Sequence, residues 1–272
     1  MPYVVNNGIR IWWEEIGSGE PVLAIMGLSF PLQMWHRTAP RLARKFRVIL
    51  FDNRGAGRSD SPSGPYWIRQ MASDARAVLD AAGVSTASVM GASMGGMIAQ
   101  ELALTCPDRV RALLLGCTWC GGLRANRPDL RHLPRLVGRR SMTPEDKMRA
   151  LIPMLYNEAT PAERIEEDMT VRLRALPTPH GYLNQLLGTV LWSSWARLTR
   201  IQVPVKIVHG QLDRLIPVSN AHLLASRIAQ ARVSVIPGAG HIFTTDQPDV
   251  ANREAADFLE EVCDGPTSLL RT

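Results

Sequence analysis

Short apolar segments recur along the chain and alternate with longer segments of helical periodicity. Continuous apolar runs of this kind are typical of strands covered on both faces, as in a parallel sheet. They occupy residues 21–26, 47–52, 87–90, 110–115, 203–208 and 233–236. Apolar residues recur at steps of three and four over 68–82, which predicts a helix ending near Gly83. Helical patterns also cover 97–104 and 250–262. The alternation predicts an α/β fold built on a mostly parallel sheet.

The N-terminal segment has a different pattern. Residues 9–15 (IRIWWEE) mix alternation with β-branched and aromatic side chains, and they follow the turn signal Asn6-Asn7-Gly8. A turn of this type beside an extended segment predicts an early β-hairpin.

Strand signals stop between residues 121 and 199. This segment is rich in Arg, Glu, Met, Leu and Pro, and its helical candidates are 144–155 and 161–176. A helical insertion between two strands is typical of a lid over the carboxyl edge of an open α/β sheet, where such sheets bind ligands. We therefore predict a core formed by 1–120 and 200–272, with a helical cap (lid) over 121–199.

A serine lies where a strand is expected to turn sharply into a helix. Residues 91–96 (GASMGG) follow the apolar run 87–90 and precede the helical pattern from Met97. Glycines on either side of Ser93 permit a crowded turn with a strained central residue, and the helix N-terminus directs free N–H groups toward it. Ser93 is therefore the candidate nucleophile, although the same motif also arises as an ordinary loop with a capping serine.

A serine hydroxyl needs a base and a carboxylate that orients the base. Asp213 lies in the loop after one predicted strand, and His241 lies on the small-residue turn after the next. The order Ser, Asp, His is that of a strand–elbow–helix hydrolase. His209 is the alternative base, but it is so close to Asp213 in sequence that we favour His241.

The oxyanion of a tetrahedral intermediate needs backbone N–H donors. Residues 26–30 (MGLSF) follow the strand at 21–26, so Leu28 can offer its N–H beside that of Met94, the residue after the nucleophile. An ordinary glycine turn is the alternative interpretation. We also expect Gly27 and Ser29 to lie against the substrate.

Four segments together resemble the α/β-hydrolase superfamily. They are 51–60 (FDNRGAGRSD), 91–96 (GASMGG), 212–217 (LDRLIP) and 240–241 (GH). The resemblance spans nearly the whole chain and implies an eight-stranded, mostly parallel sheet flanked by helices with an inserted helical cap. It also implies a Ser93–His241–Asp213 triad with an oxyanion hole at Leu28 and Met94. Within the superfamily, the chain is most similar to small cofactor-independent serine esterases and lactonases, including enol-lactonases and acyl-homoserine-lactone lactonases.

Departures from related patterns narrow the chemistry. Met26 precedes the glycine where many relatives have histidine, and the Gly-rich stretch of the carbon–carbon bond hydrolases is missing, which argues against ring-fission hydrolysis. Ser93 at the elbow argues against epoxide hydrolases and haloalkane dehalogenases, which use an aspartate there. We therefore expect hydrolysis of a carboxylic ester or lactone of a small, fairly apolar substrate through an acyl-enzyme, without metal or organic cofactor.

Two alternatives use the same fold. One is cofactor-free lyase or peroxidase chemistry at the same site, and the other is a ligand receptor without catalysis. The intact set of Ser93, Asp213 and His241 favours an enzyme over a receptor. Which ester or lactone is the natural substrate, and the oligomeric state, are left open by the sequence.

Tryptophans near the ends of the predicted cap are candidates for the substrate pocket, namely Trp119, Trp192 and Trp195. Core packing is the commoner role for such residues. The nearby Cys117 and Cys120 have C-x-x-C spacing, but no second pair or adjacent histidine in sequence completes a metal site. We therefore predict no bound metal.

Composition limits the remaining classes. The 272 residues carry a net charge of +6, but the arginines are interleaved with acidic residues, which argues against nucleic-acid binding. No apolar stretch approaches the ~18 residues of a membrane span, and the N-terminus lacks the pattern of a secretion signal. Four cysteines without disulfide-framework spacing fit a reducing compartment. The expected location is cytoplasmic.

Overall fold

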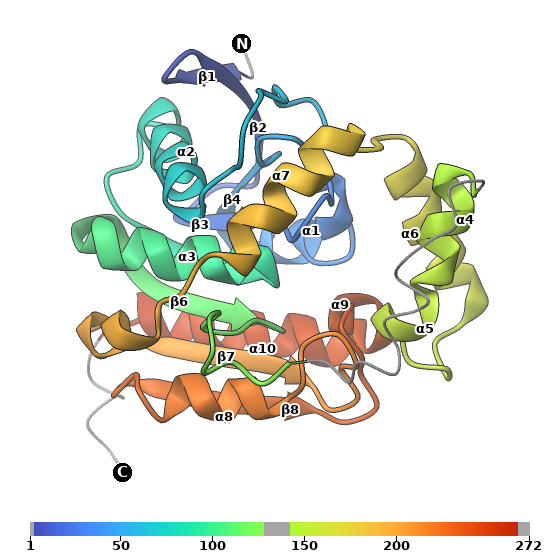
Figure 1. Ribbon diagram of the computed structural model, residues 1–272. Helices are drawn as coiled ribbons and strands as arrows, with labels where there is room; N and C mark the ends of the chain where they lie inside the picture. The colour runs from blue at the N-terminus through green and yellow to red at the C-terminus, as the bar shows by residue number, and fades with distance from the viewer. Residues whose placement is uncertain (1–2, 128–141, 266–272) are drawn as a thin grey trace.

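The computed structural model describes residues 3–127 and 142–265, which form a sheet flanked by helices on both faces (Figure 1). The sheet has eight strands in the order β1-β2-β4-β3-β5-β6-β7-β8. Strand β1 pairs antiparallel with β2, and β2 with β4, whereas the other pairs are parallel. The predicted α/β-hydrolase fold class is thus confirmed. The strands are β1 (Tyr3–Asn6), β2 (Ile9–Ile16), β3 (Glu20–Ile25), β4 (Phe46–Phe51), β5 (Ala87–Ala92), β6 (Val110–Gly116), β7 (Val205–Gly210) and β8 (Ala231–Ile236).

The predicted hairpin joins β1 to β2. Asn6 pairs with Ile9, and the two residues between them have φ of 50° at Asn7 and 79° at Gly8. Asn and Gly tolerate this left-handed backbone better than other residues, so the turn signal in the sequence has a direct structural cause.

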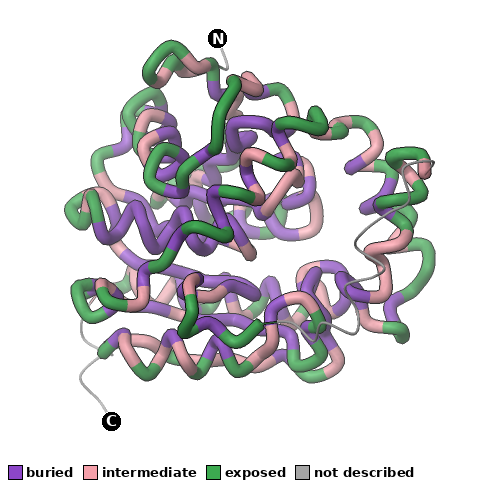
Figure 2. Tube along the Cα trace, in the orientation of Figure 1, coloured by how far each residue is buried: buried purple, intermediate pink, exposed green. Residues whose placement is uncertain are grey.

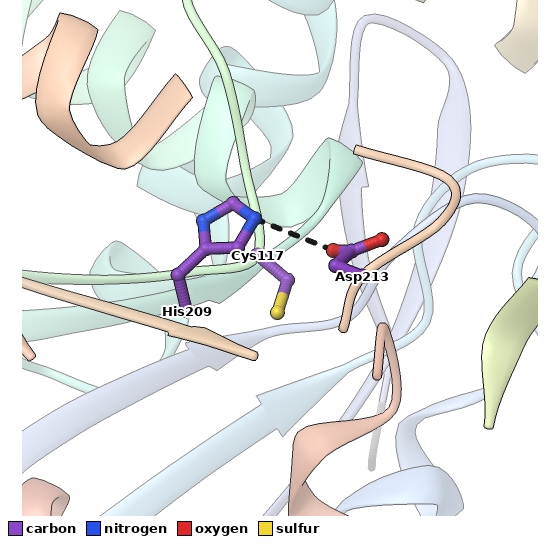
Figure 3. Close-up of side chains that lie close together, drawn as sticks. All are labelled: Cys117, His209 and Asp213. Atoms are coloured by element: carbon purple, nitrogen blue, oxygen red, sulfur yellow. Dashed lines mark ion pairs between the residues drawn. The ribbon is translucent and has the colours of Figure 1, made fainter. Parts of the chain in front are cut away.

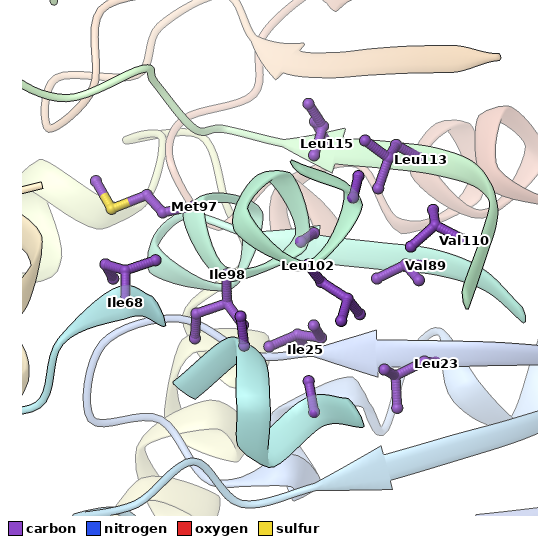
Figure 4. Packing of buried hydrophobic residues seen from close by; sticks show 14 of the residues in the cluster. Leu23, Ile25, Ile68, Val89, Met97, Ile98, Leu102, Val110, Leu113 and Leu115 are labelled. Carbon is purple, nitrogen blue, oxygen red and sulfur yellow. The ribbon is translucent and has the colours of Figure 1, made fainter. Parts of the chain in front are cut away.

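The parallel strands are apolar on both faces because helices cover both. Along β3, Leu23 and Ile25 contribute to one apolar cluster, whereas Val22 and Ala24 contribute to the other. Helices α2 (Ile68–Ala81), α3 (Met94–Thr105) and α8 (Ser219–Ala225) pack on the first face, and α1 (Ala39–Leu42) and α10 (Pro248–Cys263) on the second. Figure 4 shows α3 packed on β3, β5 and β6, and Figure 2 shows that buried residues concentrate in these layers.

The segment between β6 and β7 contains four α-helices among its described residues, α4 (Pro144–Ala150), α5 (Ile152–Leu155), α6 (Ala162–Leu173) and α7 (Pro179–Val190). We call the described residues 121–127 and 142–199 the helical insertion, and residues 128–141 of the predicted cap lie outside the described residues. An isolated bridge between Gly121 and Ser193 brings its two ends together. Figure 1 shows α4, α5 and α6 grouped at one side, with α7 lying over the core. Whether the insertion acts as a lid stays a prediction.

The helices of the insertion differ in two ways from the sequence pattern. The helix predicted over 144–155 is divided at Leu151, because Pro153 lacks an N–H and its ring would crowd the preceding turn. Helix α7 had no counterpart in the prediction. Its core-facing side carries Gly181, Gln185 and Gly188 in place of an apolar stripe.

The remaining short elements are η1 (Leu32–Trp35), η2 (Pro107–Arg109), η4 (Trp195–Arg200) and α9 (Phe243–Asp246). In the described part of the chain, no helix has the combination of length and apolar character required to cross a membrane.

Candidate active site

Ser93 occupies the turn from β5 into α3 with a strained backbone. Its φ is 55° and its ψ is −119°, a conformation that costs a non-glycine residue about 1–3 kcal/mol. The flanking glycines are required by close packing. A Cβ at Gly91 would collide with the carbonyl of Gly95, and a Cβ at Gly95 would collide with that of Ile25. Ser93 is only half-buried, so its hydroxyl is within reach of a substrate.

Gly27 lies directly against the elbow. A Cβ on Gly27 would stand 3.1 Å from the Cβ of Ser93, so the loop after β3 closely approaches the nucleophile. Among the described residues, the N–H groups of Leu28 and Met94 have no hydrogen-bond acceptor. Free backbone donors are what an oxyanion hole needs, and their place in such a hole stays a prediction.

His241 and Asp213 are in direct contact. His241 Nδ1 lies 2.8 Å from Asp213 Oδ2, and Asp213 Oδ1 accepts hydrogen bonds from the N–H groups of Leu215 and Ile216. Burial by itself would raise the pKa of Asp213, but the charge on His241 and the hydrogen bonds from His209 and His241 together hold it well below its usual range. A carboxylate of this kind fixes the imidazole orientation and leaves Nε2 for proton transfer.

All three candidate residues follow strands at the same sheet edge. Ser93 follows β5, Asp213 follows β7 and His241 follows β8, and these strands run parallel. The alternative base, His209, is fully buried, and its Nε2 lies 2.8 Å from the Ile216 carbonyl. His241 is therefore better placed than His209 to act as a base.

Asp246 was not found from the sequence. Its Oδ2 accepts from the N–H of Gly240, the residue before His241, at 2.5 Å, and its Oδ1 accepts from the Thr160 hydroxyl of the helical insertion. Burial raises the pKa of Asp246 and outweighs the hydrogen bonds from Thr160, Gly240 and Asn157 that lower it. Asp246 thus connects the histidine loop to the helical insertion.

Gln185 was also missed, and it contacts the other side of the site. This fully buried side chain on α7 accepts from the Ser29 N–H at 2.7 Å and donates to the Arg54 carbonyl at 2.7 Å. Ser29 has φ of 62°, so its peptide needs outside support. Gly181 permits the close approach of α7, because a Cβ there would stand 2.7 Å from the Gly55 carbonyl. Gly181 and Gln185 are four residues apart, which places them on one face of a helix. This spacing is the only feature of the sequence that pointed to the contact.

The three tryptophans proposed for the pocket have partners in the core. Trp192 donates from Nε1 to Glu101 at 2.8 Å, and the Arg227 guanidinium lies 5.1 Å from the ring centre of Trp195. Both pack, with Trp119, against the cluster on the α3 face of the sheet. Their contact with substrate stays a prediction.

A separate apolar cluster connects the helical insertion to the catalytic loops. Ile242 follows His241, Leu215 follows the Asp213 turn and Phe30 follows the loop at Leu28. They pack with the insertion residues Leu151, Ile152, Leu155, Tyr156 and Ile165. Apolar side chains therefore surround the candidate chemistry on the insertion side.

One group of potential metal ligands lies beside the site, formed by Cys117, His209 and Asp213 (Figure 3). The prediction had placed Cys117 in an incomplete C-x-x-C pattern, whereas the fold gives it a histidine from β7. Nε2 of His209 already contacts the Ile216 carbonyl, and Oδ2 of Asp213 already contacts His241. This set fits a hydrogen-bonded cluster better than a metal centre.

The sequence pattern of the alpha/beta hydrolase fold matches residues 20–248, so the chain belongs to the α/β-hydrolase family and is a hydrolase. A protein of Azorhizobium caulinodans that is assigned by name only as a carbamate hydrolase, RutD, is 33% identical over 268 residues, which cover 96% of this chain and 99% of the relative.

Solved structures add the same fold with two kinds of named activity. A thermophilic esterase from Thermogutta terrifontis is 28% identical with a TM-score of 0.82, covering 96% of this chain and 98% of the esterase. Est816, titled an N-acyl homoserine lactone degrading enzyme, is 29% identical with a TM-score of 0.82, covering 94% and 100%. The expected resemblance to esterases and lactonases is confirmed at the level of the family.

Proposed function

We propose that the protein hydrolyses a carboxylic ester or lactone of a small, fairly apolar substrate through an acyl-enzyme on Ser93. The observation that carries the proposal is the contact between His241 and Asp213 at the sheet edge where the strained Ser93 also lies. Names of relatives support the reaction class, since an esterase and a lactone-degrading enzyme share the fold over nearly their whole length. The apolar residues around the site favour an apolar substrate.

The proposed cycle uses only groups of this chain and water. His241 takes the proton of the Ser93 hydroxyl as its oxygen attacks the carbonyl carbon, and the resulting oxyanion accepts from the N–H groups of Leu28 and Met94. His241 then gives that proton to the leaving alcohol as the acyl-enzyme forms. Water repeats these steps on the acyl-enzyme and releases the acid and Ser93.

The first experiment is turnover of p-nitrophenyl esters by the native chain and by Ser93→Ala. We expect turnover by the native chain and its loss in the variant. Activity that survives Ser93→Ala would exclude the acyl-enzyme on Ser93. A purified protein that turns over no ester or lactone, yet retains a ligand tightly, would favour a receptor.

A second candidate is carbamate hydrolysis at the same site. It is favoured by the 33% identity to carbamate hydrolase RutD over 96% of this chain. A panel of straight-chain esters, acyl-homoserine lactones, enol-lactones and aryl carbamates, compared by kcat/KM, separates the candidates. Preference for lactones over open-chain esters of equal length would specify a lactonase, and preference for carbamates would replace the ester proposal.

A further inference from the structure

Asp213 has a second histidine beside it. His209 is on β7 and is fully buried, and its Nε2 lies 3.4 Å from Asp213 Oδ2, the same oxygen that contacts His241 (Figure 3). The proposed cycle gives His209 no proton to carry. A buried imidazole at this position therefore needs another explanation.

The hydrogen bonds define the form of the His209 ring. Nε2 lies 2.8 Å from the Ile216 carbonyl, and because a carbonyl only accepts, Nε2 carries the proton. Nδ1 is buried and has no partner among the described residues, so a second proton there would be an unpaired donor. His209 is thus an N–H donor directed at the Ile216 carbonyl and, at longer distance, at Asp213.

The contacts of Ile216 make this donor part of a closed loop. Its carbonyl accepts from His209, while its N–H donates to Asp213 Oδ1 at 2.8 Å. The imidazole therefore supports both oxygens of Asp213, one through the backbone of Ile216 and one directly. Moving His209 would loosen the turn that carries Asp213.

Cys117 completes the buried cluster from β6. Its Sγ accepts from the Gly210 N–H at 3.3 Å and donates to the Gly240 carbonyl at 3.8 Å, which joins the start of the Asp213 loop to the residue before His241. Burial and the nearby Asp213 raise the pKa of this thiol well above its usual range, so it is a neutral contact.

We propose that His209 is a positioning residue. It aims Asp213 Oδ2 at His241 and lowers the basicity of the Asp213 carboxylate. The inference rests on the proposed function. Among the described residues, the ionisable groups that face Asp213 are His241 after β8, Cys117 after β6 and His209 on β7. The charge of Asp246 also helps to raise the pKa of Cys117.

The direction of the effect follows from the charge on Asp213. Without the Nε2–H, the carboxylate is less stabilised by its surroundings and stabilises the His241 imidazolium more strongly. More alkaline solution is then needed to free His241 as a base. The acid limb of the pH–rate profile should therefore move to higher pH when His209 loses its donor.

The experiment compares His209→Leu with His209→Gln. Leucine has no donor, whereas the glutamine amide can place an N–H near the position of Nε2. We expect kcat of His209→Leu to fall about tenfold, with KM within about twofold and the acid limb at higher pH. His209→Gln should recover most of the rate and the native acid limb. Each variant is assayed on the best p-nitrophenyl ester.

Ile207→Val is the matched control, because Ile207 is buried on the same face of β7, two residues before His209. It should lower the melting temperature without moving the pH profile. If His209→Leu and His209→Gln lower the melting temperature and leave the profile unchanged, His209 is only a packing residue and the inference is wrong. In that case Ser93→Ala should still be inactive, so the proposed function stands without the role of His209. If Ser93→Ala is active, the proposed function itself is wrong.

Discussion

Two buried aspartates contact the loop that carries His241, and their environments differ in kind. Asp213 accepts from two backbone N–H groups. Burial would raise its pKa, but the charge on His241 and the contacts with the two imidazoles hold that pKa well below the ordinary range. Asp246 accepts from Gly240 and from Thr160 of the helical insertion, and its pKa is raised by burial. Asp213 is thus arranged to carry a negative charge, whereas burial disfavours the charged form of Asp246.

The difference shows how one loop is supported from two directions. Asp213 acts on the imidazole itself, so its charge enters the proposed reaction. Asp246 binds the N–H of Gly240, the residue before His241, and the hydroxyl of Thr160 in the helical insertion. A neutral amide can make both contacts. Gln185 is a comparable neutral contact. It connects α7 to Ser29, next to Leu28, whose N–H is proposed to bind the oxyanion.

Asp213→Asn should have the largest effect of the three. Without the negative charge, the Nδ1–H form of His241 is no longer favoured and the imidazolium is no longer stabilised. We expect kcat to fall by about 10³–10⁴, with KM little changed. Steady-state kinetics between about pH 6 and 9, a range that begins near the ordinary pKa of histidine, measures this loss of kcat. A loss of less than about tenfold would show that Asp213 does not orient the base.

Gln185→Leu should have the next largest effect. The variant leaves the Ser29 N–H without its acceptor and frees the peptide next to Leu28, so stabilisation of the oxyanion should weaken. We expect kcat to fall by about 10–10². Asn252→Leu is the control, because it removes another buried amide, whose donor contacts the Arg37 carbonyl, away from these loops. Equal losses in both variants would reduce Gln185 to general packing.

Asp246→Asn should change activity least. The amide can retain the contacts to Gly240 and Thr160, so kcat should stay within about fivefold of the native value. Thr86→Ala gives the baseline, because it removes only an exposed hydrogen bond to the Asp108 carbonyl, before the start of β5 and so at the opposite end of that strand from Ser93. A loss comparable with that of Asp213→Asn would contradict the proposed difference between the two aspartates.

The pH dependence of stability sharpens the same comparison. A lowered pKa in the folded state contributes stability that is present above the ordinary aspartate value of about 3.9 and is lost as pH falls through the folded value. A raised pKa contributes stability that is present below about 3.9 and is lost as pH rises through the folded value. Relative to the native chain, Asp246→Asn should therefore gain stability as pH rises above about 3.9. Asp213→Asn should instead lose stability as pH rises toward about 3.9, with a constant difference above that value. Urea unfolding across this range measures both, and parallel curves would contradict the comparison.

The strands, the elbow at Ser93 and the order of Asp213 and His241 could be predicted because each has a local signal. Apolar runs mark strands buried on both faces, and glycines beside Ser93 mark a turn without room for Cβ atoms. The contacts of Gln185 and Asp246 had no such signal. Gln185 contacts Ser29 across 156 residues of sequence, and Asp246 contacts Thr160 across 86. Glutamine and aspartate are also common on protein surfaces, so their presence does not indicate a buried contact.

Helix α7 shows why the insertion was the hardest part to predict. Its contact face is made of glycines and an amide, so apolar periodicity does not identify it. The contacts of His209 were also not predictable from the sequence. Its closeness to Asp213 in sequence argued against it as the base, and the fold places its Nε2–H 2.8 Å from the Ile216 carbonyl and, at 3.4 Å, beside Asp213. Sequence order could suggest which residues meet but not the direction of each N–H.

The central claim is that Ser93 becomes acylated. Rapid quenching of the native chain with an excess of a slowly deacylated p-nitrophenyl ester, followed by peptide mass spectrometry, tests it directly. The account predicts a burst of p-nitrophenol and the acyl mass on the peptide that contains Ser93, both lost in Ser93→Ala. Turnover without any acyl adduct on that peptide, or an adduct that persists in Ser93→Ala, would contradict it.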